Sequence, residues 1–434
     1  MSTTPSKPER ASLLPKLRSS ELWAYFGPAF VASIAYIDPG NFAANFAGGS
    51  EFGYKLLWVL LWSNLMAILV QYLAAKLGIA TGKTLPENCR ERFSRPLVWF
   101  LWVMAEISAM ATDLAEFLGA ALGFYLLFGP RFLLYGWDKT EVLLVSAFLT
   151  GICVFLILLL ELWGYRKLEL AIMGFVCIIG MCYAIEMLMI RPHWSAVIFS
   201  TLVPRLDKSS VYIAVSMLGA TVMPHVVYLH SALVQPRVKA ERAETPKHKY
   251  LARLRHLRFE TVDVFVAMNS AWLVNSAMVV VAAAVFGGHA LMNPIEDAHR
   301  TLGPLLGPAS ALVFAIALLC SGLSSSTVGT MAGQVIVEGF LHVRFSIFLR
   351  RFLTLIPAIV VIASGLDPLK ILILSQVVLS FTLPFALVPL LLLTGRREVM
   401  KEFVNNKLTH WLGWATVGVI IALNVVLLWQ QFMG

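Results

Sequence analysis

Two short motifs in this sequence place a proline beside side chains that can bind a metal ion. They are Asp-Pro-Gly-Asn at 38–41 and Met-Pro-His at 223–225. A proline inside a helix has no N–H group, so the carbonyl four residues earlier loses its helical hydrogen bond. Each motif therefore predicts a broken helix, and the two freed carbonyls are those of Ala35 and Ala220.

The groups at these two breaks form a mixed set of metal ligands. Asp38 offers a carboxylate, Asn41 an amide oxygen and Met223 a thioether sulfur, in addition to the two carbonyls. Calcium and magnesium gain nothing from a sulfur ligand, whereas softer divalent transition metals do. A lone methionine on a helix more often packs than binds, but the position beside the break favours a ligand. The predicted metal ligands are Ala35, Asp38, Asn41, Ala220 and Met223.

The composition indicates a chain that lies in lipid. Of its 434 residues, 59% are hydrophobic and only 14% are charged, with a mean hydropathy of +0.77. Soluble domains carry about 25% charged residues, and a membrane-spanning helix needs about 20 apolar residues. The sequence predicts an all-α polytopic membrane protein. Its eleven predicted spans lie at about 22–48, 53–80, 97–127, 141–162, 168–190, 209–234, 261–287, 308–338, 347–365, 369–393 and 409–431.

The positive charges are distributed unequally between the two sides of the predicted membrane. Most of the 34 lysines and arginines fall on the side that holds the N-terminal tail. The positive-inside rule makes that side cytoplasmic and places the C-terminus outside. The largest basic block, from Arg237 to Arg258, is interpreted as topogenic charge near anionic lipid, and nucleic acid is not an expected partner.

The positions of the two breaks predict an internal repeat. They fall in the first and sixth of the eleven spans, so they occupy corresponding places in two halves of five helices. Interrupted helices in corresponding positions indicate a binding site near the middle of the membrane. A proline kink healed by neighbouring helices is the alternative. We expect one transmembrane domain, 1–434, with halves at about 22–190 and 209–393 and an extra helix at about 409–431.

The third span carries three acidic residues on one stripe. Glu106 and Asp113 are two helical turns apart, and Glu116 follows three residues later. Acidic groups inside a membrane often mark a proton or ion path. Structural ion pairs with Arg350 or Arg351 are the alternative, and the two roles can coexist.

Three other polar residues lie inside predicted spans. His225 adjoins the second break and could titrate near neutral pH, although a hydrogen-bonded core histidine is the competing interpretation. His230 is interpreted as structural. Gln376 lies in the middle of the tenth span and is expected to join the metal ligands in an occluded state.

At these residues the sequence resembles the Nramp family of proton-coupled divalent metal transporters, and it looks closest to their bacterial manganese transporters. The matching elements are the two break motifs, Tyr-Leu-His-Ser-Ala-Leu at 228–233 and Met-Ala-Thr-Asp-Leu-Ala-Glu-Phe-Leu-Gly-Ala-Ala at 110–121. The resemblance covers essentially the whole chain. It implies a LeuT-like fold, alternating access, and the same five metal ligands that the prolines predict.

The resemblance also implies a proton network that leads from the metal site toward the cytoplasm. Its expected members are Asp38, Glu106, Asp113, Glu116, His225, Arg350 and Arg351. The expected activity is proton-coupled import of Mn²⁺, and also Fe²⁺, Co²⁺ or Cd²⁺, with the metal as substrate and no prosthetic group. We expect a monomer that contacts lipid in a bacterial inner membrane.

Three other functions compete with this interpretation. A carrier of amino acids or organic cations would share the fold, but the pairing of Asp38 with Met223 speaks against it. A membrane enzyme is disfavoured because the sequence contains no HExxH, no P-loop and no GxSxG with a plausible partner set. A passive metal channel would not need two broken helices. An uncoupled leak of metal ions is the alternative that the sequence leaves open.

Overall fold

All regular secondary structure in the described part of the chain is helical. The computed structural model describes residues 27–162, 165–239, 245–287, 295–296, 300, 308–343 and 346–433. Helices fit the apolar runs because a backbone in lipid must satisfy its N–H and C=O groups internally.

Both predicted breaks are present. The first run divides into α3 (Pro28–Ala35) and α4 (Pro39–Phe52), and the sixth divides into α11 (Val211–Thr221) and α12 (Pro224–Leu233). The proline of each motif is the first residue of the second helix. A missing N–H costs nothing at that position, so the prolines start new helices instead of bending old ones.

The remaining long helices occupy the other predicted runs. They are α5 (Leu57–Thr81), α7 (Arg95–Leu134), α8 (Lys139–Leu162), α9 (Tyr165–Ile190), α14 (Pro246–Phe286), α16 (Pro308–Leu341), α17 (Ile347–Ala363), α18 (Pro368–Thr394) and α20 (Lys407–Met433).

The described residues contain nine helical stretches that are long and apolar enough to cross a membrane. The stretch Pro39–Thr81 counts once because a short helical turn at Gly53–Leu56 joins its two helices. Helix α17, at 17 residues, is the shortest of the unbroken long helices. The multi-pass helical architecture is therefore confirmed, whereas the count of eleven stays a prediction.

Some helices extend beyond their predicted ends. Helix α14 begins at Pro246, so much of the basic block is helical and not loop; the Thr245 side chain caps it by accepting from the N–H of His248. Helix α7 has 40 residues. Four short helices lie between the long ones: α6 (Leu85–Arg92), α10 (Trp194–Leu202), α13 (Gln235–Lys239) and α19 (Arg397–Met400).

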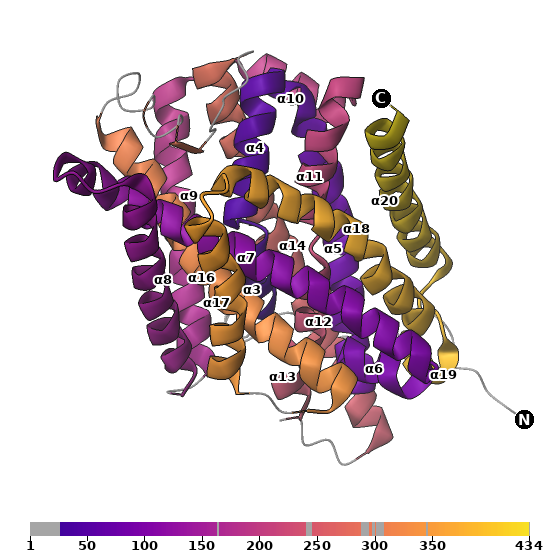
Figure 1. The fold of residues 1–434 in the computed structure, drawn as a ribbon. Helices are drawn as coiled ribbons and strands as arrows, with labels where there is room; N and C mark the ends of the chain where they lie inside the picture. Colours follow the sequence, from indigo (N-terminus) through magenta and orange to yellow (C-terminus); the bar gives the residue numbers. More distant parts are fainter. Residues whose placement is uncertain are drawn as a thin grey trace, which may run out of the picture.

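The broken helices form the centre of the molecule. In the span that contains α11 and α12, 94% of the apolar segment is buried inside the protein. The corresponding share for the span within α20 is 33%. Figure 1 shows α3, α4, α11 and α12 in the middle of the view, between α8 at one edge and α20 at the other. The chemistry-bearing motifs are therefore shielded from lipid.

Candidate functional site

Asn41 joins the two breaks. Its side-chain amide donates to Oδ1 of Asp38 at 2.7 Å and to the carbonyl of Ala220 at 2.9 Å. The same Asp38 oxygen caps α4 by accepting from the backbone N–H of Asn41 at 2.8 Å. The carbonyl of Ala220, which the proline argument predicted to be free of its helical partner, is thus turned toward the other break.

Three oxygen atoms near this junction have no hydrogen-bond partner among the described residues. They are Oδ2 of Asp38, Oδ1 of Asn41 and Oε1 of Gln376, and all three residues are fully buried. Burying a polar atom without a partner is costly, and a carboxylate oxygen is the most costly. All three atoms are hydrogen-bond acceptors. A cation can interact favourably with all of them, whereas a further acceptor cannot.

Gln376 reaches this junction from α18. A Cβ atom placed on Gly40 would clash with the Gln376 amide and would lie 3.0 Å from Oδ2 of Asp38. The Gln376 amide nitrogen donates to the hydroxyl of Ser375 at 3.0 Å. The glycine of the first motif therefore provides the space in which the amide of a distant helix approaches the carboxylate.

The other two predicted ligands also lie at the breaks. Ala35 is the last residue of α3, and Met223 is the residue immediately before α12; both are fully buried. Within the described ranges, no group of three or more His, Cys, Asp or Glu could hold a metal. The predicted ligands at the breaks are instead one carboxylate, neutral oxygens and a sulfur.

The acidic stripe on α7 meets two arginines from α17. Arg350 donates to Glu106 at 2.7 Å, and Arg351 donates to Asp113 at 3.5 Å. Arg351 also donates to the hydroxyl of Ser326 on α16. These are the ion pairs that the sequence raised as an alternative to a proton path.

Glu116 differs from the other two acids. Both of its carboxylate oxygens are buried, and in the part of the chain that the structure describes neither has a hydrogen-bond partner. A Cβ atom at Gly329 of α16 would clash with one of them and would lie 2.9 Å from Oδ1 of Asp113. The absence of a side chain at Gly329 therefore leaves room for the carboxylates of Glu116 and Asp113.

His225 connects the second break to α7. Its Nδ1 lies 3.1 Å from the hydroxyl of Thr112, the residue next to Asp113. Its Nε2 is buried and has no hydrogen-bond partner within the described ranges. The predicted residues thus form two adjoining groups: the ligands at the breaks, and the charged stripe that His225 approaches through Thr112.

A third polar group was not predicted. Gln71 of α5 donates to the Tyr36 hydroxyl at 2.5 Å, and its carbonyl oxygen lies 2.8 Å from Nδ1 of His230. Nε2 of His230 lies 2.9 Å from the carboxylate of Glu260 on α14. The structural interpretation of His230 omitted these partners. The polar residues Gln71 and Glu260 inside apolar runs were the signal that could have revealed them.

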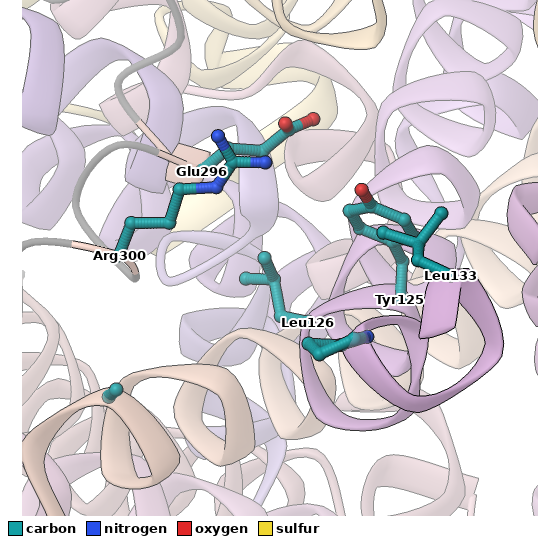
Figure 2. Close-up of a pocket in the computed structure, with 7 residues that line it drawn as sticks. Tyr125, Leu126, Leu133, Glu296 and Arg300 are labelled. Carbon is teal, nitrogen blue, oxygen red and sulfur yellow. The ribbon is translucent and has the colours of Figure 1, made fainter. Parts of the chain in front are cut away.

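A cavity of about 420 Å³ lies at the far end of α7 from the Arg350–Glu106 ion pair, and its lining includes Tyr125, Leu133 and Glu296. Figure 2 shows Glu296 and Arg300 on one side and Tyr125 and Leu133 on the other. Lys139 pairs with Glu296 at 2.6 Å. None of the predicted metal or proton residues lines this cavity.

Most of the chain matches known relatives in sequence. A family model described as Natural resistance-associated macrophage protein-like, or Nramp, matches residues 29–430. The "Divalent metal cation transporter MntH" of Caldanaerobacter subterraneus is 48% identical over 412 residues, 94% of each chain. The protein of the same name from Deinococcus radiodurans is 51% identical over 414 residues, 94% of this chain and 90% of its own.

Solved structures agree with these relatives. The Eremococcus coleocola manganese transporter aligns with a TM-score of 0.81 and 32% identity, over 95% of this chain and 88% of its own. MhsT in complex with L-phenylalanine aligns with a TM-score of 0.58 and 14% identity, over 92% and 97% of the two chains, which shows the fold alone. The predicted LeuT-like fold is confirmed. The chain belongs to the Nramp family.

Proposed function

We propose that this chain imports divalent transition-metal ions together with protons. Nramp membership and the MntH relatives support a divalent metal cation transporter and not an enzyme. The finer proposal is Mn²⁺ as cargo, with Fe²⁺, Co²⁺ and Cd²⁺ also accepted. The observation that carries it is the set of three unpartnered buried oxygens, from Asp38, Asn41 and Gln376, at the junction of the two broken helices.

The metal is held at the breaks in this proposal. Asp38 supplies the negative charge, and the carbonyls of Ala35 and Ala220 supply neutral oxygens together with the two amides. Met223 supplies sulfur, which favours softer divalent ions over calcium and magnesium. The metal is the substrate in this scheme, and no prosthetic group is required.

Protons leave the site along α7 in this proposal. Asp38 and His225 exchange a proton near the metal, and Thr112 places His225 next to the stripe. Asp113 and Glu116 carry it further, and Glu106 lies beyond them at the Arg350 end. Arg350 and Arg351 offset the negative charge of the acids along this path. The same residues can therefore form ion pairs and support proton transfer.

The fold suggests how access alternates. Two halves of five helices, about 22–190 and 209–393, would rock around the junction, because each half contributes one broken helix. A monomer suffices since the proposed ligands come from one chain. We place it in the bacterial inner membrane with its N-terminus in the cytoplasm, following the charge bias of the sequence.

Metal uptake into proteoliposomes tests the proposal. Mn²⁺ entry should saturate, should rise when the outside is acidic relative to the lumen, and should be accompanied by lumenal acidification. An ionophore that collapses the pH gradient is the control. Saturable uptake that ignores the gradient and moves no protons would contradict coupling, while unsaturable uptake would indicate a channel.

A further inference from the structure

An apolar groove of about 550 Å³ lies between α7, α18 and α20, away from the broken helices. Its walls are large apolar side chains, several of them exposed at the surface; for example, Val425 is 56% exposed. Representative lining residues are Phe93, Leu97, Phe385, Leu392, Val425 and Leu428.

The groove offers no free polar group to an occupant. Asn424 is the polar residue among those that line it. Its amide donates to the carbonyl of Ser380 at 2.8 Å, and its oxygen accepts from the Ser380 hydroxyl at 2.8 Å. Because both ends of this amide are already paired, the groove fits an apolar chain better than a polar ligand.

One end of the groove is basic. Arg95 starts α7, between the lining residues Phe93 and Leu97. Arg396 and Arg397 lie shortly after Leu392, beyond the end of α18 at Thr394. All three arginines are exposed, and none of them forms an ion pair with another described residue. Helix α18 contacts both α6 and α7, and Figure 1 shows the start of α7 and α19 at the same end of the molecule.

We propose that this groove binds one acyl chain of an anionic phospholipid, whose phosphate contacts the basic end formed by Arg95, Arg396 and Arg397. Two acids, Glu398 and Glu402, lie on the neighbouring segment and leave an excess of positive charge. Basic groups at a membrane surface attract anionic headgroups. The positive-inside prediction places this end at the cytoplasmic leaflet, where such lipids are concentrated.

A second copy of the chain is the less suitable occupant. Apolar surfaces in lipid have no hydrophobic drive to associate, so helix pairing relies on small residues that permit close contact. The groove is instead lined by phenylalanine and leucine, and the Phe100 and Phe385 rings meet edge to face at 5.1 Å across α7 and α18. An acyl chain can follow such an uneven wall.

Lipid titration of the purified full-length protein tests the headgroup contact. Phosphatidylglycerol and phosphatidylcholine with identical chains are compared by native mass spectrometry and by thermal shift. Phosphatidylglycerol should bind more tightly. The triple variant Arg95→Gln/Arg396→Gln/Arg397→Gln should lose about fivefold in affinity for each arginine, roughly a hundredfold in all. Lys370→Gln, at the opposite end of α18, is the matched control and should change nothing.

Filling the groove tests the acyl-chain contact. Val425→Trp should weaken binding of both lipids, whereas Val419→Trp, an exposed position on α20 outside the groove, should not. If Val425→Trp does not fold, Ile421→Trp serves the same purpose. Equal binding of the two lipids by wild type, or no effect of the groove variants, overturns the proposal. A dimer that the groove variants disrupt identifies a second copy as the occupant and overturns it too.

Discussion

The junction of the broken helices and the stripe on α7 both bury charge, but they neutralise it differently. On the stripe, Glu106 and Asp113 each have an arginine partner from α17. At the junction, no described residue forms an ion pair with Asp38. Its unpartnered second oxygen does not set it apart, because Glu106 and Asp113 each have one too. A buried charge without a partner is costly. Two acids of the stripe therefore have cations that the protein supplies, and the third, Glu116, has none among the described residues. The described residues supply no cation at the junction, as the proposed metal site requires.

Removing the charge at the junction should have the largest effect. Asp38→Asn keeps the shape of the side chain but removes its charge, so the bound metal ion loses its carboxylate partner. Losing one partner of a buried ion pair costs about 3–5 kcal/mol, more than roughly a hundredfold in affinity for the metal. We expect saturable Mn²⁺ uptake to fall to the level of empty liposomes. Asp138→Asn, at an exposed loop position, is the control. Robust uptake by Asp38→Asn would remove Asp38 from the ligand set.

Removing a cation from the stripe should destabilise the fold instead. Arg351→Met leaves Asp113 buried without its partner, at a cost of about 3–5 kcal/mol. The thermal unfolding midpoint in detergent should drop by several degrees, whereas Asp38→Asn should leave it unchanged or raise it. Arg131→Met, exposed at the other end of α7, controls for the loss of one arginine. If both buried variants lower the midpoint equally, the contrast between the two regions is wrong.

Neutralising the stripe should affect protons more than metal. Asp113→Asn cannot carry a proton, so the variant should lose most of its metal-stimulated proton influx and the pH dependence of uptake. Metal binding, measured by calorimetry, should largely survive. Asp207→Asn, whose ion pair with Lys55 is exposed, is the matched control. Normal proton movement with lost metal binding would make the stripe a structural support.

The smallest effect concerns selectivity. Met223→Ala lets water, an oxygen ligand, replace the sulfur, so Mn²⁺ uptake should continue while the preference for Cd²⁺ declines. Competition by millimolar Ca²⁺ or Mg²⁺ should increase, and each tenfold change requires only about 1.4 kcal/mol. Met217→Ala, a buried methionine of α11 that packs against Gly48, is the control. Unchanged selectivity in Met223→Ala would identify Met223 as packing.

Local backbone chemistry made the breaks predictable. Proline lacks an N–H at every position, but Pro384 and Pro389 lie inside the continuous helix α18. Pro39 and Pro224 could be recognised because each lies beside side chains that can bind a metal ion. The acidic stripe was predictable for a similar reason, because helical periodicity places Glu106, Asp113 and Glu116 along one line. The arginine partners were named only as one of two alternatives, since the sequence does not specify how α17 packs.

The sequence by itself determined the membrane class, the two interruptions and the identity of the chemical groups at them, since composition and proline geometry are local properties. Only the tertiary structure decided that Asn41 bonds to Ala220, that Gln376 enters the space beside Gly40, and that Gln71 meets His230. These contacts join residues more than 150 positions apart. Helix packing sets them, because it depends on the shapes of all the intervening side chains at once.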